Sequence, residues 1–75
     1  MMSTDEVKKL IEAGIPNADV QVTDLTGTSD HFEAVVVSPG FDGVSLIQRH
    51  QMVYAALGDA MKGAIHALKL QTRTP

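Results

Sequence analysis

The sequence predicts an α+β domain in which two helices pack on one face of a three-stranded mixed sheet. Three observations support this class. Helical and strand periodicities follow one another in the order α-β-β-α-β, and each strand alternates apolar with polar residues, which leaves it one face for a core. A helix also separates the second strand from the third, so these two should run parallel with a right-handed crossover. With 75 residues, the chain is expected to form a single domain over residues 1–75.

The first helix is expected over residues 4–13. Ser3 and Glu6 have the spacing of a capping box. Apolar side chains then recur at helical spacing, at Val7, Leu10 and Ile11. Gly14 suits the left-handed position that ends a helix, and Pro16 prevents its continuation.

A β-hairpin is expected next. Residues 18–24 alternate apolar with polar and predict a strand with one solvated face. Residues 26–30, TGTSD, have the composition of a turn. Residues 31–38 are rich in β-branched side chains and predict a second strand, antiparallel to the first.

A longer helix is expected from a second capping box at Ser45 and Gln48 to about residue 62, with Gly63 ending it. On a helical wheel its apolar stripe consists of Leu46, His50, Val53, Leu57, Met61 and Ala64, with Ile47 and Tyr54 at the edge. Residues 66–71 alternate again and predict the third strand.

Two histidines open the two strands that should be parallel neighbours, His31 the second strand and His66 the third. Parallel strands begin at the same edge of a sheet, and adjacent strands lie about 4.8 Å apart. Topology therefore brings the two imidazoles within reach of a single metal ion.

Composition excludes several classes of function. The chain has no cysteine, which removes disulfides, thiol catalysis and thiolate ligands from this chain and favours an intracellular, cytoplasmic protein. A net charge of −3 does not suit a dedicated nucleic-acid-binding domain. No apolar run approaches the ~20 residues of a membrane span, and no signal-peptide pattern is visible at the start.

Three short motifs resemble the BolA-like proteins. They are Phe41-x-Gly43, then Arg49-His50-x-x-Val53-Tyr54, then His66-Ala67-Leu68. Their order and spacing cover essentially the whole chain, and the order of elements fits the class II KH-like fold of that family.

The resemblance implies a non-enzymatic iron–sulfur adaptor. BolA-like proteins form heterodimers with monothiol CGFS glutaredoxins around a 2Fe–2S cluster, to which the glutaredoxin cysteine and glutathione contribute thiolates. The histidine of the H-A-L motif, here His66, is one ligand on the BolA side, and the loop ligand is best matched by His31. Because the loop has no cysteine, this side would offer two imidazoles, which raise the reduction potential and release the metal on protonation. The isolated protein is expected to carry no cofactor, and homodimerisation stays open.

The remaining motif residues have structural interpretations. His50 lies in the middle of the apolar stripe and is expected to be a partly buried core histidine. Arg49 beside it would form an exposed salt bridge or receive the partner or glutathione carboxylates. Gly40-Phe41-Asp42-Gly43 spells the GxxG that clamps nucleic acid in KH domains. Asp42 would repel a phosphate, so we expect a tight turn at Gly43 with Phe41 in the core.

The alternative function is a KH-like nucleic-acid-binding transcriptional regulator. Its contacts would come from Arg49, Lys62, Lys69 and Arg73 against an acidic background, which predicts weak binding to DNA. An enzyme has little support: Asp30 beside His31 could pair a base with the residue that orients it, but no nucleophile accompanies them.

Overall fold

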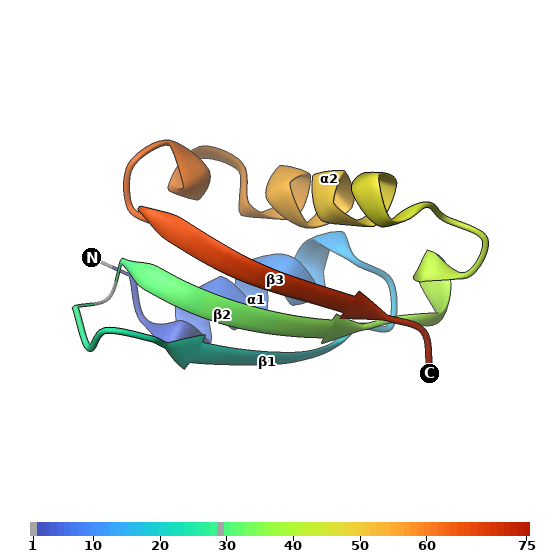
Figure 1. The fold of residues 1–75 in the computed structure, drawn as a ribbon, viewed down its shortest axis with the longest axis horizontal. Coiled ribbons are helices and arrows are strands. Elements are labelled where there is room, and N and C mark those ends of the chain that lie inside the picture. Colours follow the sequence, from blue (N-terminus) through green and yellow to red (C-terminus); the bar gives the residue numbers. More distant parts are fainter. Residues whose placement is uncertain (1, 29) are drawn as a thin grey trace.

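The computed structural model describes residues 2–28 and 30–75 of the chain. Its elements, in chain order, are α1 (Thr4–Gly14), β1 (Asp19–Asp24), β2 (His31–Val37), the 3-10 turn η1 (Pro39–Phe41), α2 (Leu46–Leu57), the 3-10 turn η2 (Gly58–Lys62) and β3 (Ala67–Arg73). Two helices and a three-stranded mixed sheet in this order (Figure 1) confirm the predicted fold class.

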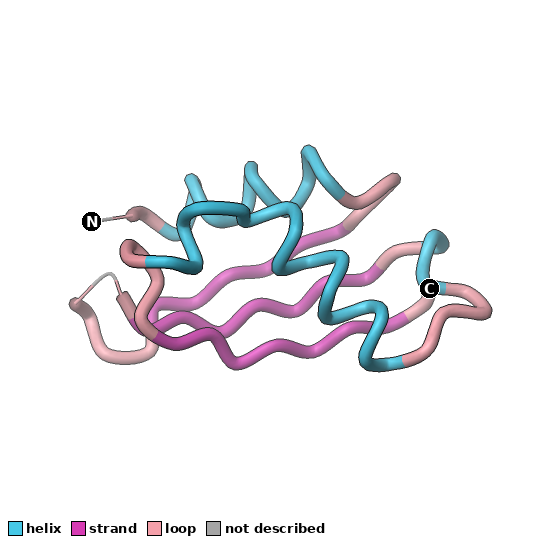
Figure 2. Tube along the Cα trace, turned by 90° about the horizontal axis from the view of Figure 1, so that it is seen from above, coloured by secondary structure: helices cyan, strands magenta, loops and turns pink. Residues whose placement is uncertain are grey.

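The sheet has the order β1-β2-β3, with β1 antiparallel and β3 parallel to the central strand β2. Alternate residues of β2 are fully buried, namely Phe32, Ala34 and Val36. Both helices lie on this side of the sheet (Figure 2) and contribute buried residues to the same core, among them Val7 and Ile11 from α1 and Val53 and Leu57 from α2. Among the described residues, no helix covers the opposite face of the sheet.

The first helix begins as predicted, since the Ser3 side chain accepts from the Glu6 amide and the Glu6 side chain accepts from the Ser3 amide. Its end differs from the prediction. Gly14 is the last residue of α1 and is not in the left-handed conformation, and the cap residue Ile15 is extended. A Cβ at Gly14 would lie 2.4 Å from the Cβ of Ala56, so glycine is required there because α1 and α2 approach closely.

The second helix is shorter than the sequence indicated. It ends at Leu57, where Gly58 takes a positive φ of 56°, and η2 replaces the last predicted turn. The predicted stripe is also wrong in the first turn, because Leu46 and Ile47 are 61% and 72% exposed. β3 begins one residue later than predicted, at Ala67, and so His66 precedes the strand.

The connection between β2 and α2 is a tight turn around buried side chains. Ser38 is fully buried; its hydroxyl donates to the carbonyl of Pro16 (2.6 Å) and accepts from the Gly40 amide (3.0 Å). Phe41 is fully buried, and Gly43 has a positive φ of 74°. The GxxG segment therefore serves to turn the chain into α2. In the described part of the chain, no helix has the length and apolar character needed to cross a membrane.

Candidate metal centre

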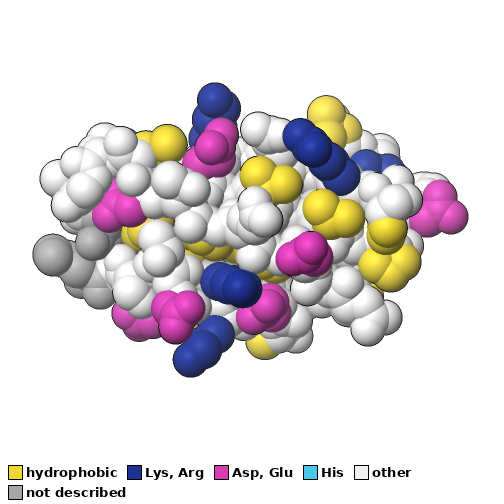
Figure 3. Space-filling view, turned by 90° about the horizontal axis from the view of Figure 1, so that it is seen from below, with side chains coloured by type: hydrophobic (Ala, Val, Ile, Leu, Met, Phe, Trp, Pro, Cys, Tyr) yellow, Lys and Arg dark blue, Asp and Glu magenta, His cyan; other side chains and the backbone are white. Residues whose placement is uncertain are grey.

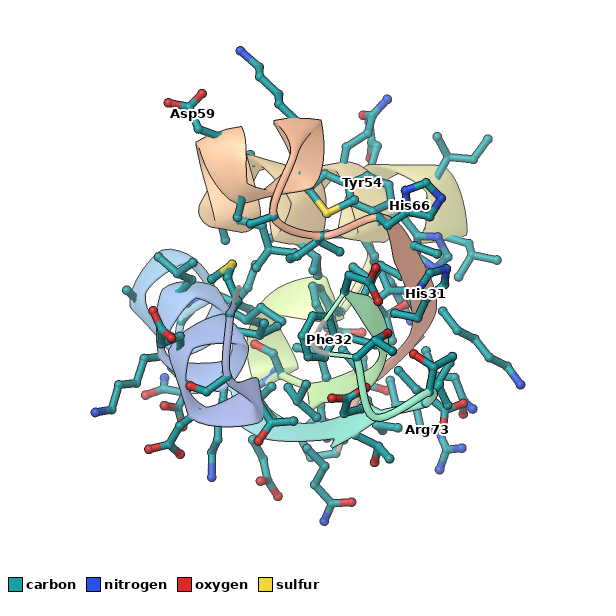
Figure 4. The ribbon with its side chains drawn as sticks, turned by 90° about the vertical axis from the view of Figure 1, so that its left-hand side faces the viewer. His31, Phe32, Tyr54, Asp59, His66 and Arg73 are labelled. Atoms are coloured by element: carbon teal, nitrogen blue, oxygen red, sulfur yellow. The ribbon has the colours of Figure 1, made fainter. Side chains whose placement is uncertain are left out.

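His31 and His66 lie together at the end of the sheet where β2 and β3 begin. His31 pairs with Ala67 in the parallel register, which places His66 one residue before the paired segment. The two ring centroids are 5.0 Å apart and the ring planes meet at 50°. His31 is half-buried and His66 is exposed, and both rings lie at the same rim of the molecule (Figure 4).

This separation fits two imidazoles on one metal ion. A metal–nitrogen bond of about 2.0 Å and a ring radius of about 1.1 Å put the centroids of two ligating rings about 5 Å apart at a tetrahedral angle. The 5.0 Å between the His31 and His66 ring centroids agrees with that spacing. Within residues 2–28 and 30–75, no group of three or more His, Asp or Glu side chains could hold a metal ion.

Hydrogen bonds that involve side chains connect the described residues of the loop before His31. The Asp24 carboxylate accepts from the amides of Thr26 (3.3 Å) and Gly27 (2.9 Å). The hydroxyls of Thr26 and Thr28 are 2.5 Å apart, and the Thr28 hydroxyl donates to Oδ1 of Asp30. These bonds bring Asp30 into the position from which it contacts His31.

Asp30 contacts His31 directly, with 2.7 Å between its Oδ1 and the Nδ1 of the ring. The hydrogen bond from Thr28 and then the one from His31 hold the pKa of the Asp30 carboxyl below its usual value of 3.8. At neutral pH the group is therefore an ionised carboxylate, which accepts hydrogen bonds and donates none.

The main chain of Asp30 contacts the other histidine segment. Its carbonyl oxygen accepts from the amides of His66 (2.7 Å) and Ala67 (3.1 Å). Sequence reasoning considered Asp30 only as an orienting residue in an enzyme, and it missed Thr28. The only sequence signal for these contacts is the TGTSD composition of the loop. This composition predicts a turn, but it does not predict that the Asp30 carboxylate contacts the His31 ring.

Two other motif residues make contacts within α2 and with the segment before it. His50 is half-buried and is not one of the fully buried core residues; its ring meets Tyr54 edge-on at a centroid distance of 6.5 Å. The contacts of Arg49 differ from the exposed salt bridge that the sequence predicted. Its Nε donates to the carbonyl of Val44 (2.9 Å), and its guanidinium carbon lies 5.7 Å from the centre of the Phe41 ring. The side chain therefore contacts the turn before α2.

The basic residues considered for nucleic-acid contact are dispersed. Lys62 pairs with Asp59 at 3.4 Å, Lys69 pairs with Glu33 at 3.6 Å, and Arg73 donates to Gln71 at 2.8 Å. On the side of the molecule away from α2, basic and acidic side chains are interspersed (Figure 3). This face therefore shows no concentrated positive patch.

Comparison with known proteins assigns the family. The sequence model for "BolA-like protein" matches residues 12–75. The DNA-binding transcriptional regulator BolA of Escherichia coli is 30% identical over 81 residues, covering 99% of this chain and 77% of that protein. BolA-like protein 1 of Bos taurus is 49% identical over 49 residues, covering 65% of this chain and 36% of that protein. The chain thus matches little more than a third of the length of this mammalian relative.

The fold agrees with the same assignment. The structure of a bolA protein homologue from Coxiella burnetii superposes with a TM-score of 0.85 at 43% identity, covering 100% of this chain and 94% of that one. The family match extends over both histidines of the candidate metal centre. The chain belongs to the BolA-like protein family.

Proposed function

We propose that this protein is a non-enzymatic adaptor that shares a 2Fe–2S cluster with a monothiol CGFS glutaredoxin, in cluster assembly, trafficking or iron sensing. The observation that carries the proposal is the 5.0 Å separation of the His31 and His66 rings at one rim of the sheet. The family resemblance supplies the partner, whose cysteine and glutathione would complete the coordination.

The chemistry of the residues supports this division of ligands. With no cysteine in the chain, the histidine pair can offer only nitrogen to the metal. Two imidazoles on one iron have a precedent in Rieske centres, where they raise the reduction potential. An imidazole binds metal only in its neutral form. Acid would therefore break the bonds between the metal and the histidines of this chain before the bonds between the metal and the partner's thiolates.

Co-expression with a CGFS glutaredoxin in the presence of glutathione tests the proposal. A coloured heterodimer is expected on gel filtration, with the visible absorption and circular dichroism of a 2Fe–2S cluster. His66→Ala should alter or abolish these spectra, while His50→Ala, which removes the third histidine from α2, should preserve them. A cluster spectrum that survives His66→Ala unchanged would refute the site.

The name of the Escherichia coli relative favours a second function, DNA binding. In this chain the basic residues available for DNA contact lie on separate elements, and Lys62 and Lys69 are paired with carboxylates. Binding would therefore be weak and would fall steeply with salt. A mobility shift of duplex DNA at low salt, lost on Lys69→Ala together with Arg73→Ala, would support this function; no shift would exclude it.

A further inference from the structure

We propose that Asp30 is a positioning residue for the histidine pair: its carboxylate holds the neutral His31 ring in the Nδ1–H tautomer, so that Nε2 is the nitrogen presented to a metal. The use of that nitrogen rests on the proposed function. The tautomer itself rests on the hydrogen bonds of the loop and can be tested in the isolated protein.

The tautomer follows from counting protons along the loop. A hydroxyl carries one proton, and that of Thr28 is donated to Oδ1 of Asp30. The 2.5 Å contact between the Thr26 and Thr28 hydroxyls must then use the proton of Thr26. Donors therefore run from Thr26 to Thr28 to Asp30, and the chain of hydrogen bonds ends on a carboxylate.

The contact between Asp30 and His31 needs a proton from the ring. Oδ1 of Asp30 lies 2.7 Å from Nδ1 of His31, and an ionised carboxylate only accepts. Nδ1 must therefore carry the proton, and in a neutral ring the lone pair is then on Nε2. A carboxylate in this position also fixes the ring orientation and makes the opposite nitrogen a stronger metal ligand.

The side chain and the main chain of Asp30 act on different histidines. The carboxylate contacts His31, whereas the carbonyl oxygen accepts from the amides of His66 and Ala67. Asp30→Ala removes the first contact and retains the second. The substitution should therefore change the His31 ring and leave the position of His66 in place, which makes His66 an internal control.

Long-range ¹H–¹⁵N correlation spectra of the isolated protein test the tautomer. They should be recorded at about pH 8.5. In the native protein the protonated nitrogen of His31 is expected to be Nδ1. In Asp30→Ala the ring should shift toward the Nε2–H form, which free imidazoles favour in water.

Asp59→Ala is the matched control. It removes the same charge, but Asp59 lies on η2, points away from His31 and His66 (Figure 4), and pairs with Lys62. His31 in this variant should show the native pattern. An Nε2–H ring in the native protein, or an unchanged Nδ1–H ring in Asp30→Ala, would overturn the proposal.

A second measurement tests the consequence for the metal. In the heterodimer with glutaredoxin, Asp30→Ala should speed cluster loss to a chelator, because removing a carboxylate behind a ligating histidine typically lowers metal affinity about 10- to 100-fold. Asp59→Ala should lose the cluster at the native rate. Equal rates in all three proteins would refute the role of Asp30 toward the metal. A native heterodimer without a cluster would instead refute the proposed function and leave the tautomer result standing.

Discussion

The backbone carbonyl of Asp30 accepts a hydrogen bond from the backbone amide of His66 at 2.7 Å. Because the carboxylate of the same residue contacts the ring of His31, one residue is bonded to both candidate ligands. The hydrogen bonds of Asp30 therefore connect the two histidines, whose rings also lie close together. This arrangement makes the loop before β2 part of the candidate metal centre.

The lowered pKa of Asp30 predicts how stability changes with pH. A carboxyl whose pKa is lower in the folded state stabilises the fold fully above its unfolded pKa and loses this contribution as the pH falls through the folded value. The hydrogen bonds from Thr28 and His31 hold the pKa of Asp30 below 3.8, so its contribution should be present above that pH and should be lost as the pH falls below it. In urea titrations above and below that pH, Asp30→Ala should be less stable than the native protein at pH 6 and should lose less stability on acidification. Parallel curves for the two proteins would contradict the assignment.

The close approach of α1 and α2 predicts that Gly14→Ala is destabilising. The new methyl group would meet the Cβ of Ala56, and overpacking of this kind typically costs about 1–3 kcal/mol. Gly63→Ala is the control, because nothing lies within 4 Å of a Cβ there. Urea denaturation should show the loss only at Gly14.

Ala56→Gly provides a further check on that contact. It removes the methyl group that Gly14→Ala would strike, so the double variant should be more stable than the sum of the two single effects predicts. Additive effects in this cycle would show that the two helices do not meet at these residues.

Arg49 is predicted to stabilise the fold and not to receive a partner. Removing the hydrogen bond from its Nε to Val44 and its packing over Phe41 should lower the free energy of unfolding by about 1 kcal/mol in Arg49→Ala. Lys62→Ala, which removes only an exposed ion pair, should change it by less than about 0.5 kcal/mol. Both variants should still form the heterodimer; loss of the complex with Arg49→Ala at unchanged stability would assign the residue to partner binding instead.

Sequence periodicity was sufficient for the order of elements and for the meeting of the two histidines. A crossover helix between β2 and β3 implies parallel strands, and parallel strands begin at one edge, so the positions of His31 and His66 followed from topology. The 5.0 Å between the rings required coordinates, because it depends on rotamers and on the register of His31 with Ala67.

The wrong predictions for the two helices concern tertiary contacts and backbone conformation, which a helical wheel does not represent. Leu46 lies on the apolar side of the wheel yet is 61% exposed, and the buried residues of α2 come later in the helix, at Val53 and Leu57. Gly58 ends the helix earlier than Gly63 because it takes a positive φ there. Gly14 has the sequence context of a cap, but its position is determined by Ala56 in another helix.

The central claim is that two histidine nitrogens of this chain bind one cluster. The most direct measurement is the nitrogen hyperfine coupling of the reduced heterodimer, with ¹⁵N-histidine incorporated only in this chain. Two strongly coupled ¹⁵N nuclei are predicted in the native complex, and one in either His31→Ala or His66→Ala. A reduced cluster with no ¹⁵N coupling from this chain would contradict the claim.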